Sequence, residues 1–156
     1  MVDLDALARQ TLAHNRFMVL GTVDPSGRAR VSPVWFSMVD HRDLYWLSNP
    51  ESHHSQNIDE RPEVAIVVFD SMADPHTGQA VYLEATAERV APDELAAACA
   101  AAFEGVGATL SFTPESLEDE PFVLYRARVT ASEIHVRGRD VGVGQSDRRV
   151  PVQLAQ

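Results

Sequence analysis

The sequence predicts a β-rich (α+β) fold: a six-stranded antiparallel barrel with short flanking helices. Six segments have the apolar or alternating pattern of strands, and they follow one another with few helices between them. The length of 156 residues is that of one domain. Strict alternation of strands and helices is missing, which argues against a doubly wound fold, and closure into a barrel removes exposed sheet edges.

Turn residues separate the predicted strands. Asp24-Pro25-Ser26-Gly27 has the composition of a type I turn and joins the first two strands into a hairpin. Pro33 indicates an open stretch, an edge or a bulge in the second arm, because proline has no N–H to donate. The continuous apolar run 64–69 indicates a strand buried on both faces. The predicted strands are 17–23, 28–38, 44–48, 64–69, 79–90 and 122–136.

Three helices are predicted, and each has a start signal. Asp3 can cap the first helix, and Ser52 can cap a short polar helix that runs to Arg61. Pro92-Asp93-Glu94 opens an Ala-rich helix before the last strand. Residues 111–120 are acidic and are predicted to be a loop.

The chain is predicted to divide into a domain, residues 1–138, and an arginine-containing C-terminal arm, residues 139–156. In the arm Gly and Arg replace the apolar pattern. We expect the arm to be mobile or to order against a partner.

Composition excludes several classes of function. The 13 basic residues are all arginine and the 23 acidic residues give a net charge of −10, which disfavours nucleic acid and anionic membranes as partners. Without lysine there is no Schiff base and no Walker-type phosphate lysine. The single cysteine, Cys99, excludes an internal disulfide and suits a reducing cytoplasm. An acidic start and no apolar run long enough to span a bilayer also favour the cytoplasm.

Two segments are candidate binding regions. Residues 52–57 place polar side chains at a helix N-terminus, which suits a phosphate; the alternative is a solvated surface helix. A metal site at His53 and His54 is disfavoured, because adjacent helical residues point in different directions. Near Pro33, backbone groups without ladder partners could bind a flat polar ring, and the alternative is an ordinary amphipathic strand.

Side-chain catalysis has little support in the sequence. The Gly-x-Ser-x-Gly nucleophile motif is missing, Cys99 lies among alanines where a buried thiol is inert, and the carboxylates at 118–120 face water. A bound cofactor is therefore the expected source of any chemistry.

The order of these segments resembles the pyridoxamine 5'-phosphate oxidase-like flavin-binding split barrels over residues 17–138. The segments that carry the resemblance are Asp24-Pro25-Ser26-Gly27, Val31-Ser32-Pro33-Val34-Trp35-Phe36 and Ser52-His53-His54-Ser55-Gln56-Asn57-Ile58, the last leading into the strand that ends at Asp70. The resemblance implies a split barrel, a homodimer with cofactor sites at the subunit interface, and FMN as cofactor.

The resemblance also implies which residues bind the cofactor. The second strand lies along the isoalloxazine ring, and the end of the third strand with the following helix holds the phosphate. By this match the ring residues are Arg30, Val31, Ser32, Pro33, Val34 and Trp35, and the other cofactor-binding residues are Leu47, Ser48, Asn49, His53, His54 and Asn57.

Two departures affect the expected activity. His53 and His54 stand where many relatives have Arg and Lys, so phosphate binding depends on partly charged imidazoles and should weaken as pH rises. The segment His135-Val136-Arg137-Gly138 lacks the substrate-gripping residues of true pyridoxamine phosphate oxidases, which argues against vitamin B6 oxidation.

The function predicted from the resemblance is hydride transfer between FMN and a small-molecule substrate. The alternatives are a deazaflavin-dependent reductase and a flavin- or haem-binding protein without turnover, because the same barrel serves all of these.

Overall fold

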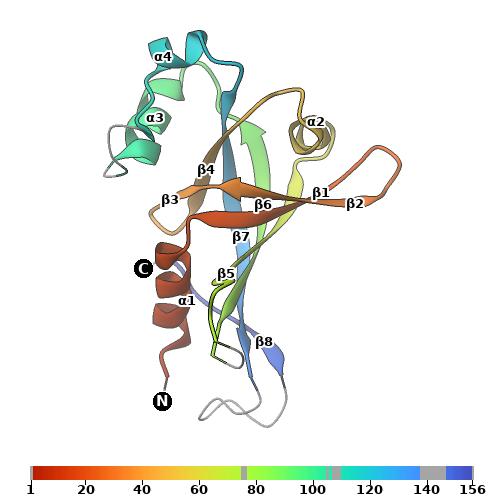
Figure 1. The fold of residues 1–156 in the computed structure, drawn as a ribbon, viewed down its shortest axis with the longest axis vertical. Coiled ribbons are helices and arrows are strands. Elements are labelled where there is room, and N and C mark those ends of the chain that lie inside the picture. The colour runs from red at the N-terminus through yellow and green to blue at the C-terminus, as the bar shows by residue number, and fades with distance from the viewer. Residues whose placement is uncertain (1, 75–76, 105, 107–109, 138–146, 156) are drawn as a thin grey trace.

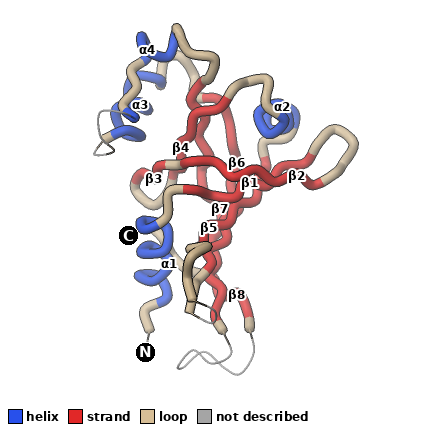
Figure 2. Tube along the Cα trace, in the orientation of Figure 1, coloured by secondary structure: helices blue, strands red, loops and turns tan. Residues whose placement is uncertain are grey.

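The computed structural model describes residues 2–74, 77–104, 106, 110–137 and 147–155. Its strands form one antiparallel sheet that curls into a half-barrel, which confirms the β-rich split-barrel prediction (Figure 1). Helices lie around the strands (Figure 2). In the described residues the sheet has eight strands, in the order β2-β1-β5-β6-β7-β4-β3 with β8 paired to β7, so the predicted number of six is too low.

The bounds of most elements agree with the sequence pattern to within a few residues. The strands are β1 (Phe17–Val23), β2 (Ala29–Trp35), β3 (Ser37–Val39), β4 (Asp43–Ser48), β5 (Glu63–Phe69), β6 (Ala80–Arg89), β7 (Val123–Val136) and β8 (Arg148–Pro151). The helices are α1 (Leu4–His14), α2 (His53–Glu60), α3 (Leu95–Phe103) and α4 (Pro114–Glu118).

Residues 28–38 form two strands instead of the one predicted. The N–H of Phe36 donates to the carbonyl of Arg16 at 3.0 Å, next to the β1–β2 pairing, and from Ser37 the chain pairs with β4 instead. Strands β2 and β3 therefore bridge from one part of the sheet to the other (Figure 1).

The other additional strand lies in the predicted C-terminal arm. Strand β8 pairs with β7, and Val152 and Leu154 are buried in the main core. From residue 147 to residue 155 the segment thus orders against its own chain, whereas 139–146 lie outside the described residues.

The main core lies between β1–β3 and the strands that they cross (Figure 1). Trp46 is fully buried and stacks on Tyr125 with ring centroids 5.6 Å apart, and α1 covers one end of the core with Ala8 and Leu12. Only one face of β5 is buried: Ala65 and Phe69 on its other face are exposed, so the prediction of burial on both faces is wrong.

A second apolar cluster lies under α3 and α4. It contains Cys99 and Phe103 of α3, and Trp35 and Leu47 pack against it from β2 and β4. Helix α4 falls in the segment predicted to be a loop; Thr113 begins it with a reciprocal capping box. None of the described helices combines the length and the apolar character that crossing a bilayer requires.

Candidate functional site

The free edge of β2 exposes unpaired backbone groups. Among the described residues strand β2 pairs only with β1, and the N–H of Asp24 donates to the carbonyl of Arg28 at 2.9 Å. In an antiparallel ladder, residue pairs that exchange hydrogen bonds alternate with pairs that do not. Counting from the bonded pair of Asp24 and Arg28, the pair of Val19 and Pro33 is one that does not. Pro33 therefore costs no ladder bond, and the backbone groups of Val31 and Trp35 point toward the free edge.

The side chains of β2 divide between two faces. Residues that pair with buried positions of β1 face the interior, and those between them lie on the outer face, where Val31 is 72% exposed. Facing inward are Arg30, Ser32 and Val34; facing outward are Val31, Pro33 and Trp35. The predicted shared face of Arg30 and Ser32 is confirmed.

Helix α2 packs on β1 and β2 and keeps two backbone donors free at its start. Its cap Ser52 donates its own N–H to the carbonyl of Asn49 at 3.0 Å and accepts from the N–H of Ser55 at 3.4 Å. The backbone N–H groups of His53 and His54 have no acceptor among the described residues. Two first-turn amides and the positive end of the helix dipole therefore remain for an anion.

His54 joins this helix end to the end of β4. Its Nε2 lies 2.6 Å from the hydroxyl oxygen of Ser48 and 3.2 Å from that of Ser52. Partial burial, and after it the charge of His53, lowers the pKa of His54 below the usual histidine value. This shift favours the neutral form of the ring over the charged form on which the sequence-based expectation relies.

Other predicted residues hold the site together. Asn57 is buried and donates from its amide to the hydroxyl of Thr22 at 3.0 Å, which fixes α2 on β1. Asn49 accepts from the N–H of Glu51 at 2.8 Å and shapes the turn before α2. Whether either side chain also contacts a cofactor stays a prediction.

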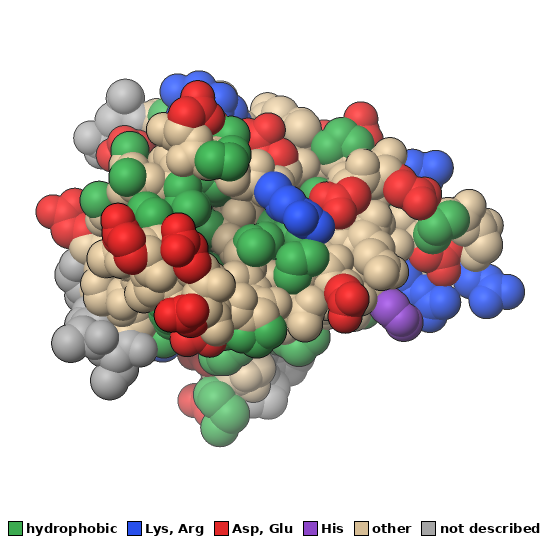
Figure 3. Space-filling model, turned by 90° about the horizontal axis from the view of Figure 1, so that it is seen from above, with side chains coloured by type: hydrophobic (Ala, Val, Ile, Leu, Met, Phe, Trp, Pro, Cys, Tyr) green, Lys and Arg blue, Asp and Glu red, His purple; other side chains and the backbone are tan. Residues whose placement is uncertain are grey.

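Arg30 is partly neutralised by its neighbour. Its guanidinium donates to Asp24 at 3.1 Å, and hydrogen bonds from Ser26, Arg28 and Arg30 lower the pKa of Asp24 to about 2. Seen from above, arginine and histidine side chains gather at the end of the molecule that carries the β1–β2 hairpin, while acidic side chains are numerous at the α3–α4 end (Figure 3). Arginine and histidine side chains thus lie at the α2 end although the net charge is −10.

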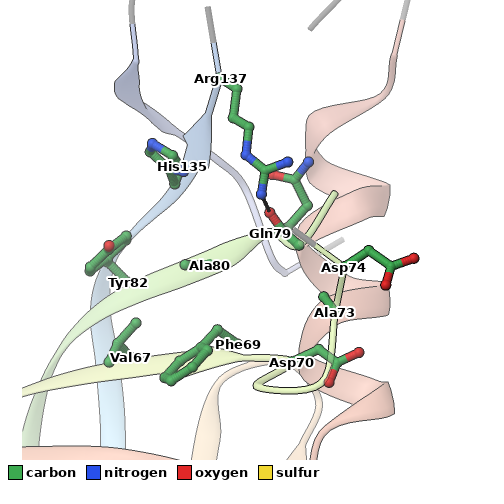
Figure 4. Close-up of a pocket in the computed structure, with 11 residues that line it drawn as sticks. Val67, Phe69, Asp70, Ala73, Asp74, Gln79, Ala80, Tyr82, His135 and Arg137 are labelled. Carbon is green, nitrogen blue, oxygen red and sulfur yellow. Dashed lines mark hydrogen bonds between the residues drawn. The ribbon is translucent and has the colours of Figure 1, made fainter. Parts of the chain in front are cut away.

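A cleft that the sequence did not single out lies at the other end of β5 and β6, with a volume of about 470 Å³. Arg137 reaches into it from β7 and donates to the carbonyl of Gly78 (Figure 4). The amide oxygen of Gln79 is buried there without a hydrogen-bond partner among the described residues. No sequence signal marked Gln79, because its burial results from tertiary packing.

Metal and thiol chemistry have no support in the part of the chain that is described. There, no three His, Cys, Asp or Glu side chains are placed to hold a metal ion. Burial raises the pKa of the Cys99 thiol, so this cysteine is not poised as a nucleophile.

The curled antiparallel sheet with its flanking helices defines the class of protein as a split barrel. The family model described as pyridoxamine 5'-phosphate oxidase matches residues 4–135, and the chain belongs to that family. No curated protein matches the sequence.

Solved structures of the same fold bind different cofactors. A heme binding protein from Mycobacterium smegmatis is 22% identical with a TM-score of 0.71; the alignment covers 97% of this chain but only 59% of that one. A heme storage protein from Vibrio cholerae is 21% identical (TM-score 0.67, 83% and 92% covered). A FAD-binding protein from Mesorhizobium loti is 18% identical (TM-score 0.66, 86% and 94% covered). At these identities the likeness establishes the fold alone.

Proposed function

We propose that this protein is an FMN-dependent oxidoreductase that transfers a hydride between the flavin and a small molecule. The carrying observation is the pair of free amides at His53 and His54, close to the Ser48 hydroxyl, on a helix that packs on β2, whose other edge is free. A phosphate fits the free amides of α2, and a flat ring with donors and acceptors fits the free edge of β2.

The residues present fit such a cofactor in chemistry. Helix α2 packs on β1 and β2, and β2 also approaches β4, so the helix that carries the free amides and the strand that carries the free edge are neighbours. Ser48 and the neutral His54 ring donate or accept hydrogen bonds, and the backbone of Val31 and Trp35 does the same along the edge. Trp35 and Leu47 rest on the α3–α4 cluster, which gives the ring end an apolar wall.

A bound flavin supplies the hydride chemistry, and the protein residues supply position and exclusion of water. In this proposal the amides of His53 and His54 fix the phosphate, and the edge of β2 sets the plane of the ring. The lone buried thiol of Cys99 agrees with a cytoplasmic location, which is part of the proposal.

The proposal includes a homodimer. The outer face of β1, β2 and β5 exposes large apolar side chains: Phe17 is 61% exposed, Val31 72% and Phe69 43%. Register places Val19, Val67 and Pro33 between them on the same face. An apolar surface of this kind on one chain supports contact with a second copy.

Sedimentation equilibrium tests the homodimer. The measured mass should be twice the chain mass of 17.2 kDa, and Val31→Asp should shift it toward that of the monomer. A monomeric parent protein would contradict this part of the proposal.

A cofactor panel tests the proposal. The purified protein is titrated with FMN, riboflavin, a deazaflavin coenzyme and haemin, and absorbance is followed. We expect FMN to bind about tenfold or more tightly than riboflavin, because only FMN has the phosphate for the α2 amides. Equal affinity for both flavins would remove the phosphate anchor.

A second candidate is a binding protein without turnover, which the two haem-binding structural neighbours favour. It predicts that haemin binds more tightly than either flavin, or that bound FMN is not reduced by NADH or NADPH. Anaerobic reduction kinetics of the FMN-loaded protein separate the two candidates: rapid bleaching of the flavin supports the oxidoreductase, and none supports the carrier.

A further inference from the structure

A separate cleft of about 540 Å³ lies between the end of α1 and the β2–β3 bend. Trp35, Phe36 and Met38 form an apolar side, and His14, Arg16 and His41 line the other. Its volume is in the range of small-molecule sites. Trp35 is the last residue of the strand proposed to carry the flavin ring, so the cleft adjoins the proposed cofactor position.

The charge of this cleft is unusual for the chain. Of its 11 described lining residues one is arginine, two are histidine and none is acidic, although acidic residues outnumber arginines by 23 to 13 in the whole sequence. The guanidinium of Arg16 has no ion-pair partner among the described residues. Asp40, which precedes the lining residue His41 in the sequence, lines an adjoining cleft. His14 and His41 line both clefts, and the adjoining one also includes Arg9.

Local hydrogen bonds prepare the polar side of the cleft. Nδ1 of His14 lies 2.8 Å from the carbonyl of Gln10, and the amide of Asn15 donates to the carbonyl of Thr11 at 2.7 Å. The bond from Asn15 occupies the carbonyl of Thr11, one of the last four of α1, and the bond to Gln10 fixes the orientation of the His14 ring. The hydroxyl oxygen of Ser37 is buried on the other side without a partner among the described residues.

We propose that this cleft binds a small molecule with an aromatic body and a carboxylate. The Trp35 side of the cleft contacts the aromatic part, and Arg16 and the imidazoles attract the carboxylate. As a binding site the cleft stands on its own residues; as the substrate site of the oxidoreductase it rests on the proposed function.

Calorimetric titration tests the site with matched probes. Benzoate and 2-naphthoate are each compared with the corresponding neutral amide, first with the protein as purified and then with the FMN-loaded protein. We expect each carboxylate to bind about tenfold more tightly than its amide. Arg16→Gln should reduce that preference to less than threefold, and Ala13→Trp, which fills the cleft from α1, should weaken both probes.

The matched control is Arg42→Gln, which removes the same charge close to His41 but lines a different cleft. It should leave the preference within twofold of the parent protein. Equal binding of carboxylates and amides, no saturation with any probe, or equal loss in Arg16→Gln and Arg42→Gln would overturn the proposal. Carboxylate binding without FMN binding would support the site and reject the oxidoreductase; FMN binding without carboxylate binding would reject the site and leave the flavin proposal to the reduction kinetics.

Discussion

Two polar clusters of this molecule differ in how completely their hydrogen-bonding groups are used. Around Arg126 of β7 the guanidinium donates to Glu88 of β6 and to both carboxylate oxygens of Glu94, at distances up to 3.2 Å. Hydrogen bonds to Glu88 and then Glu94 raise the pKa of Arg126 above its already high value. This cluster is charged and saturated, and it ties the start of α3 to the sheet.

The other cluster, Ser48, Ser52 and His54, is neutral and unsaturated. It joins β4 to α2 but leaves the amides of His53 and His54 without acceptors among the described residues. The contrast indicates that the use of hydrogen-bonding groups distinguishes a structural cluster from a binding site. Where all groups are paired, the cluster holds helices and strands together. Where backbone donors remain without acceptors, the cluster can still bind a ligand.

Breaking the saturated cluster should have the largest effect. Arg126→Met should lower the free energy of unfolding by about 2–3 kcal/mol, because four hydrogen bonds to a buried guanidinium are lost. The loss stays below that of a fully buried pair, since Glu88 and Glu94 are 58% and 49% exposed and water can solvate them. Urea unfolding measures it, with Arg128→Met, which removes an exposed ion pair to Asp43, as control at no more than about 1 kcal/mol. Equal losses of unfolding free energy in Arg126→Met and Arg128→Met would show that the Arg126 cluster stabilises the fold no more than an exposed ion pair does.

The next effect concerns the bond that holds α2 in place. Thr22→Val leaves the buried amide of Asn57 without its acceptor and should cost about 1–2 kcal/mol of unfolding free energy. Thr86→Val on the exposed face of β6 serves as control and should change stability by no more than about 0.5 kcal/mol. If both substitutions are neutral, Asn57 is free to serve the cofactor instead.

The sequence located α2 and its cap because helix starts have local signals. Asp3 and Ser52 were identified from residue type and the apolar pattern that follows. The hairpin turn at Asp24 was visible for the same reason. The bond from Asn57 to Thr22 spans 35 residues, and no local pattern encodes such a contact.

Tertiary context also explains the errors in the fold. The outer face of β5 is apolar though exposed, so periodicity alone mistook it for a strand buried on both sides. The break between β2 and β3 at Phe36 arises because β2 pairs with β1 whereas β3 pairs with β4. Strand β8 forms by pairing with the far end of β7. The neutral state of His54 depends on burial, which the sequence does not show.

The unsaturated cluster should respond in ligand affinity more than in stability. His54→Ala should weaken FMN binding about tenfold, or about 1–2 kcal/mol, by removing one hydrogen bond to the phosphate and the link to Ser48. His53→Ala, whose side chain is exposed and whose backbone amide is kept, should weaken it less than threefold. Riboflavin affinity should be unchanged in both variants. Equal effects of the two substitutions would show that the helix end, and not the His54 ring, holds the phosphate.

The smallest effect is a pH dependence of stability that belongs to the same ring. The pKa of His54 is lowered in the folded protein, so below about pH 6.5 the unfolded chain binds a proton that the folded chain does not. Unfolding free energy should therefore fall as pH is lowered from 7 to 5, with a slope from this group below about 1.4 kcal/mol per pH unit. His54→Gln should flatten that slope and His53→Gln should not. Bound FMN should flatten it as well, because a phosphate beside the ring raises its pKa again; a slope that is the same with and without FMN would place the phosphate away from His54.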